Sequence, residues 1–109
     1  MSKLLLLTEA THDVLPTPTT LLTLGVKQFS QLTLEVENQD GTQTLDVLIW
    51  RRASVNGPYS LSPFDLLTGI APGESRCVDI DVTGTVDFQL RAQASGIGLT
   101  CRTAGTLVE

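Results

Sequence analysis

Several stretches of this chain alternate strictly between apolar and polar residues, with glycine or proline between one stretch and the next. Residues 31–37, 76–82 and 86–94 each place an apolar side chain at every second position. A half-buried strand requires this period of two, because successive side chains of a strand point to opposite faces of its sheet. These segments predict an antiparallel β structure in which each sheet has one buried face and one solvated face.

The spacing of strands and turns favours a single all-β domain. Seven or eight short strands alternate with turn signals such as residues 38–43 and Pro72–Gly73, and residues 64–67 form a short strand or one helical turn. We predict a two-sheet antiparallel β-sandwich, immunoglobulin-like or jelly-roll-like, with a small β-barrel as the second choice. The predicted core is apolar and strand-borne: Leu32, Leu34, Val36, Leu45, Val47, Ile49, Val78, Ile80, Val82, Val86, Phe88 and Leu90.

The N-terminal segment differs from the rest of the chain. Residues 4–7 are four consecutive leucines without alternation, and Pro16 and Pro18 exclude a helix. We predict an extended arm over residues 1–18, which forms a first strand or lies across a neighbouring subunit, and a sandwich over residues 19–109. The leucine run is shorter than a signal-peptide core of roughly 7–15 apolar residues or a membrane span of about 20. We therefore expect synthesis in a bacterial host cytoplasm and no membrane association.

Composition argues against several classes of function. Twelve acidic and seven basic residues give a net charge of −5, which repels nucleic acid. The chain has one histidine and two cysteines at distant positions, fewer ligands than a structural zinc site needs. His12, next to Asp13, is expected to be a solvated loop residue without the rigid support that a catalytic base requires. We predict no catalytic residue, no metal and no cofactor.

The remaining polar candidates have structural interpretations. Alternation places Glu35 with Glu37, and Asp79 with Asp81, on outer strand faces, where solvated charge prevents edge aggregation. With Asp40 they are the only candidate calcium ligands, and calcium needs six to eight converging oxygens. Cys77 and Cys101 fall on opposite strand faces, polar and apolar respectively, so we expect two free thiols.

One strand is apolar on both faces. In residues 44–53, Leu48 and Trp50 point away from the predicted core face. Trp50 either packs beneath the 54–75 loops or is an exposed aromatic anchor for a partner subunit or a sugar ring. The candidate partner contacts are accordingly Leu4, Leu5, Leu6, Leu7, Leu48 and Trp50.

Three segments together carry a family resemblance. Residues 32–53 contain a V-E-N strand end and a strand opening T-L-D, residues 70–84 contain A-P-G-E-S, and residues 86–103 contain L-R-A followed by S-G. Over about residues 20–105 the chain resembles small all-β structural proteins of tailed-phage virions, including head decoration (cement) proteins and other minor virion components. A similar order of motifs occurs in bacterial immunoglobulin-like adhesion domains. The resemblance implies no catalytic residue.

Two functions follow as expectations. The first is a non-enzymatic bacteriophage virion structural protein that decorates the capsid, with copies of itself and the major capsid or other virion proteins as partners. A trimer is the first expectation for self-association. The alternative is a carbohydrate-binding or adhesion-type immunoglobulin-like module, for which Trp50 and Tyr59 are the only candidate platform residues.

Overall fold

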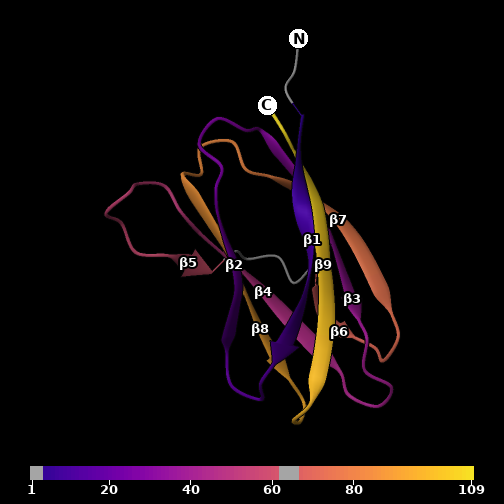
Figure 1. The fold of residues 1–109 in the computed structure, drawn as a ribbon. Coiled ribbons are helices and arrows are strands. Elements are labelled where there is room, and N and C mark those ends of the chain that lie inside the picture. The colour runs from indigo at the N-terminus through magenta and orange to yellow at the C-terminus, as the bar shows by residue number, and fades with distance from the viewer. Residues whose placement is uncertain (1–3, 62–66) are drawn as a thin grey trace.

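The computed structural model describes residues 4–61 and 67–109, and these residues form strands joined by turns (Figure 1). The predicted element at residues 64–67 lies outside the described residues except for Leu67. The strands are β1 (Leu4–Val14), β2 (Thr19–Gly25), β3 (Gln31–Asn38), β4 (Leu45–Arg52), β5 (Ser60–Leu61), β6 (Leu67–Ile70), β7 (Ser75–Asp81), β8 (Asp87–Ala94) and β9 (Leu99–Val108). No helix long and apolar enough to cross a membrane occurs in the described part of the chain.

The strands form two antiparallel sheets that pack as a sandwich, as predicted. Sheet A has the order β1-β9-β3-β7, and sheet B has the order β2-β8-β4-β5, with β6 also paired to β4. Strands from the two halves of the chain pair in reverse order: β1 with β9, β2 with β8, β3 with β7 and β4 with β6. The topology is that of a jelly roll, since an immunoglobulin sandwich keeps its first two strands in one sheet.

The core between the sheets is built from the alternating residues. Every predicted core residue is buried except Val78 and Val86, which are half-buried. Val78 lies on the edge strand β7 and packs against the core from the rim, and Val86 lies in the turn just before β8. Phe88 is the largest side chain that is fully buried, so aliphatic residues fill most of the space around it.

The N-terminal segment supplies a strand of sheet A. Residues 4–14 form β1, which pairs along its length with β9, so the structure has the first of the two arrangements considered for residues 1–18. The register shifts between Leu7 and Ala10, where β1 has one residue more than β9. This bulge separates the leucine run from the rest of the strand.

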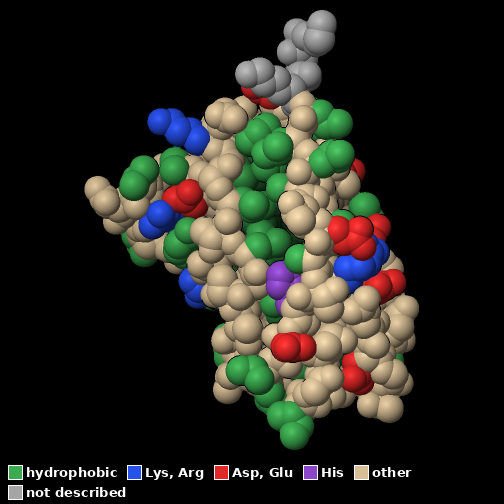
Figure 2. All heavy atoms as spheres, in the orientation of Figure 1, with side chains coloured by type: hydrophobic (Ala, Val, Ile, Leu, Met, Phe, Trp, Pro, Cys, Tyr) green, Lys and Arg blue, Asp and Glu red, His purple; other side chains and the backbone are tan. Residues whose placement is uncertain are grey.

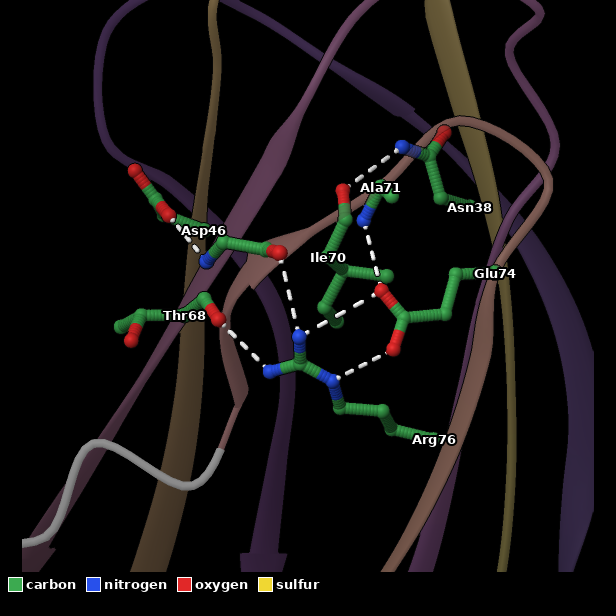
Figure 3. Close-up of polar contacts among 8 residues, drawn as sticks. Asn38, Asp46, Thr68, Ile70, Ala71, Glu74 and Arg76 are labelled. Atoms are coloured by element: carbon green, nitrogen blue, oxygen red, sulfur yellow. Dashed lines mark hydrogen bonds and ion pairs between the residues drawn. The ribbon is translucent and has the colours of Figure 1, made fainter.

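The V-E-N and A-P-G-E-S motifs meet in space beside β6 (Figure 3). Asn38 is fully buried, and its side-chain amide donates to the carbonyls of Gln43 and Ile70. Its backbone exchanges hydrogen bonds with the turn formed by residues 71–74, in which Gly73 has φ +76° and Pro72 precedes it. These motifs therefore specify a turn and its anchor.

Arg76 ties the two sheets together beside that turn. Its guanidinium donates to the carbonyls of Thr68 and Gly69 in β6, at 2.6 and 3.1 Å, and pairs with Glu74 (Figure 3). Asp46 accepts a hydrogen bond from the Gly69 amide on the same strand. The hydrogen bond from Arg76 and one from the Ala71 amide lower the pKa of Glu74.

Both cysteines are free, as predicted. Cys77 is exposed on β7 and Cys101 is buried on β9. Burial raises the pKa of the Cys101 thiol to about 11, so this side chain behaves as a small core hydrophobe.

Candidate interaction surfaces

The single histidine lies within a strand. His12 belongs to β1, is half-buried, and its Nε2 lies 2.8 Å from the hydroxyl of Thr103 on β9. The expectation of a solvated loop histidine is therefore wrong, because residues 4–14 are a paired strand rather than a loop. The adjacent Asp13 points outward and is exposed.

Three acidic residues of sheet A surround one arginine. Arg102 on β9 pairs with Glu9 on β1 and with Glu35 and Glu37 on β3. The three carboxylates raise the pKa of Arg102, which stays charged. Among the described residues, no group of three or more His, Cys, Asp or Glu side chains is arranged to hold a metal ion.

Other acidic side chains have local roles. Asp79 accepts a hydrogen bond of 2.6 Å from the Thr33 hydroxyl across the β3–β7 pair. Asp40 accepts bonds from the backbone amides of Thr42 and Gln43, which lower its pKa. These carboxylates stabilise the sheet and its turns.

An apolar groove runs along one side of the sandwich, between β1 of sheet A and β2 of sheet B. It has a volume of about 430 Å³. Figure 2 shows it as a band of hydrophobic side chains with the histidine toward one end. Its walls are formed by Leu6, Leu7, Thr8, Ala10, His12, Leu21, Leu22, Leu24 and Thr103.

Two of the four leucines of β1, Leu6 and Leu7, line this groove. Leu4, Leu5 and Leu6 are 63%, 49% and 73% exposed, whereas Leu7 is half-buried and packs against the core. Leu7 lies over Gly105 of β9, where an added Cβ would come within 2.9 Å of the leucine and 2.8 Å of the Thr33 carbonyl oxygen. Gly105 is therefore the residue that allows β1 to lie close on the sheet at this point.

Sequence analysis missed the β2 wall of the groove. Leu22 and Leu24 alternate as a strand should, but Leu21 breaks that alternation. The structure shows why: the register between β2 and β8 shifts between Thr20 and Leu22. Two adjacent leucines in a threonine-rich strand were the available signal for this bulge.

A second surface lies on the outer face of sheet B. Trp50 is half-buried, and the guanidinium of Arg91, from the neighbouring β8, lies 4.2 Å from its ring centre. The guanidinium groups of Arg52 and Arg91 lie 4.8 and 5.9 Å from the centre of the Tyr59 ring. Arg52 in turn pairs with Asp87. This group forms a compact arrangement of aromatic and guanidinium groups.

The predicted contact residues thus fall into two separate sets. The leucines of residues 4–7 lie on the edge strand of sheet A, and Leu48 and Trp50 lie on the outer face of β4 in sheet B. Leu48 is half-buried opposite Arg91. The structure therefore presents two surfaces on different sheets, and only the first is apolar and highly exposed.

Comparison with known sequences gives no relative. No family model matches the chain. No curated protein matches it either.

Comparison with solved structures shows the fold. The SPBc2 prophage-derived protein YomS matches with a TM-score of 0.63 at 14% identity, over 100% of this chain and 96% of that one. A protein of the disulfide-linked pili that form Bacillus endospore appendages matches with a TM-score of 0.64 at 10% identity, over 99% and 88%. A protein of the infectious bursal disease virus Gx strain matches with a TM-score of 0.55 at 11% identity, over 98% of this chain but 32% of its own. At these identities the chain shares a jelly-roll fold with proteins of varied origin.

Proposed function

We propose that this chain is a non-enzymatic structural protein of a bacteriophage virion, which decorates the capsid and acts through contacts with its own copies and with the major capsid or other virion proteins. The observation that carries the proposal is the apolar side of the sandwich, where Leu6 and Leu7 line the β1–β2 groove and Leu4, Leu5 and Leu6 are exposed. Exposed apolar area costs about 25 cal/mol per Å² in water. A contiguous patch of this kind is typical of a protein that works through association.

The fold supports the same proposal. Jelly rolls are common in viral capsid proteins, and this chain matches a prophage-derived protein over nearly the full length of both chains. The polar groups that sequence analysis considered for chemistry are engaged in structural contacts: His12 with Thr103, and Glu35 and Glu37 with Arg102. These contacts favour a structural role over a catalytic one.

The adhesion alternative depends on Trp50 and Tyr59. A sugar-binding platform requires an aromatic ring face open to the ligand, but the Arg91 guanidinium already lies over the Trp50 ring. The arrangement therefore favours an interface residue over a sugar platform. Trp50 and Leu48 are kept in the proposal as a second contact with another virion protein.

The test is to look for the protein in purified particles. Virions made from a genome that encodes the chain should retain it through density-gradient purification, and antibodies against it should label the head. Particles that lack the protein should lose their DNA at a lower temperature. Its absence from purified particles, together with glycan binding that is lost in Trp50→Ala, would overturn the virion assignment in favour of adhesion.

Removal of residues 1–18 would test the fold rather than association. It would delete β1, which pairs along its length with β9 and places Val14 in the core. Substitutions at the exposed leucines leave the strand in place, so they separate loss of association from loss of fold.

A further inference from the structure

The sheets have free edges, and these edges differ in how well they are protected against pairing with another chain. In the described residues, β1 and β7 are the outer strands of sheet A, and β2 lies at one edge of sheet B. Free edges invite strand addition unless charges, bulges or shortness block it. The protection of each edge can therefore be compared directly.

Three edges carry such protection. The outward face of β7 presents Asp79 and Asp81. β2 contains a register shift between Thr20 and Leu22 and follows Pro18. The described part of the opposite edge of sheet B consists of β5 and β6, which have two and four residues, and residues 62–66 lie outside the described part of the chain.

The edge formed by β1 is the exception. This strand has 11 residues, and its first four described positions are leucines without a charge among them. The bulge and Glu9 come only after Leu7. The leucine run is thus an unprotected, apolar strand edge.

We propose that two copies of this chain pair through the leucine run of β1, antiparallel and around a two-fold axis, so that sheet A continues from one copy into the other. The inference rests on the proposed function and names its self-association surface. It replaces the expected trimer by a dimer, because two identical antiparallel strands satisfy each other's edges and close at two copies.

The pleat limits the register of this pair. Opposed residues must lie on the same face of the continuous sheet, so an antiparallel pair of identical strands must place one residue opposite its own copy. Within the leucine run, pairing centred on Leu5 or on Leu6 keeps most of the contact between leucines. Pairing centred on Leu5 sets Leu4 opposite Leu6, whereas pairing centred on Leu6 sets Leu5 opposite Leu7 and already brings Leu4 opposite Thr8 in the bulge.

Charge favours a second copy on this edge over contact through the faces. The chain carries a net charge of −5, so two copies repel each other unless they meet at a neutral surface. The outer face of sheet A is acidic, because Glu35 and Glu37 share a single cation, Arg102, and β7 adds Asp79 and Asp81. The leucine run is uncharged, and pairing there brings two apolar groove walls together.

The first test measures the mass of the intact chain by sedimentation equilibrium. The wild-type chain should be a dimer, and Leu6→Lys should weaken dimerisation at least about tenfold, because a lysine on an edge strand opposes the addition of another strand. Ile97→Lys is the matched control, since Ile97 is an 80% exposed apolar residue in the β8–β9 turn and should leave the dimer intact. A wild-type monomer or trimer, or a dimer unaffected by Leu6→Lys, would overturn the proposal.

A second test locates the axis. In a Cys77→Ser background, Leu5→Cys or Leu6→Cys should form a covalent dimer on oxidation, because the residue on the axis faces its own copy, whereas Ile97→Cys should not. If neither leucine position crosslinks more than the Ile97 control, the proposed pairing is wrong.

Two further measurements, the dimer mass at different salt concentrations and the presence of the chain in purified virions, distinguish this inference from the proposed function. An apolar junction should keep its dimer mass from low salt to about 1 M salt, whereas an association through charged faces weakens with salt. Dimer loss in salt would count against the β1 edge. A wild-type dimer that is absent from purified virions would contradict the proposed function alone, while a virion-bound chain whose purified form is monomeric would contradict the dimer alone.

Discussion

The two long sides of the sandwich, where the edges of its sheets come together, differ in the contacts between the sheets. On the side of β6 and β7, Arg76 donates to two β6 carbonyls, and Asn38 anchors the neighbouring turn. On the side of β1 and β2, leucines from both sheets line an open groove of about 430 Å³. Polar contacts on the first side satisfy the backbone within one chain. The second side leaves apolar surface that another chain can cover.

This contrast suggests that the two sides have different roles, one in stability and one in association. The closed side, at β6 and β7, fixes the relative position of the two sheets, so changes there should lower stability. On the open side, the exposed leucines of residues 4–6 add little to the stability of one copy, so changes at these residues should alter association instead. The predictions below test that division.

The largest expected effect is at Asn38. Asn38→Ala removes the fully buried amide that donates to the carbonyls of Gln43 and Ile70, and it should lower the free energy of unfolding by about 3 kcal/mol. Chemical denaturation measures the loss. Gln39→Ala, at the exposed next position, should change it by less than about 0.5 kcal/mol. A loss below about 1 kcal/mol at Asn38 would show that the anchor is dispensable.

Gly105→Ala should have the next largest effect. Its methyl group would press against the Thr33 carbonyl and Leu7, and we expect a loss of about 2 kcal/mol in thermal or chemical unfolding. Gly41→Ala is the control, because no atom lies within 4 Å of its added Cβ. Equal stabilities of the two variants would mean that β1 can move away from β9 without cost.

Arg76→Ala should cost less, about 1 kcal/mol, because the side chain is partly exposed and its ion pair with Glu74 is weakened by solvent. Arg76→Lys should recover only part of this, since an ammonium cannot reproduce the geometry with which the guanidinium binds two carbonyls and a carboxylate. If Arg76→Lys restored the full stability, the positive charge alone would account for the contribution of Arg76.

The smallest effect is on pH dependence. Because the pKa of Glu74 is lowered in the folded chain, its contribution to stability is complete above its ordinary value of 4.5 and is lost as pH falls through the lower folded value. Glu74→Gln should therefore flatten the acid side of a stability–pH curve. An unchanged acid limb would show that Glu74 contributes nothing through its charge.

The sequence was sufficient to predict strands but not their partners. Alternation identified most of the core and the different environments of Cys77 and Cys101, because side-chain parity is a local property. It could not choose a jelly roll over an immunoglobulin sandwich, because that choice depends on pairs such as β1 with β9. The contact of His12 with Thr103 was not predictable either, because it joins the same two strands, which are far apart in the sequence.

Interaction surfaces were predictable only in part. The leucine run was visible as an apolar segment, and Trp50 as an outward aromatic residue. The Arg91 group over Trp50 and the β2 wall of the groove come from neighbouring strands, so their positions depend on register. Strand register in turn depends on bulges that a single sequence signals weakly.

Amide hydrogen exchange at several protein concentrations tests the central claim most directly, because it compares the two edges of sheet A in one experiment. Amides of residues 4–7 that point away from β9 should exchange more slowly as concentration rises, in step with the dimer fraction. Amides of residues 75–81 on the β7 edge should not change. Exchange in residues 4–7 that is independent of concentration, or protection that appears at β7 instead, would contradict the account.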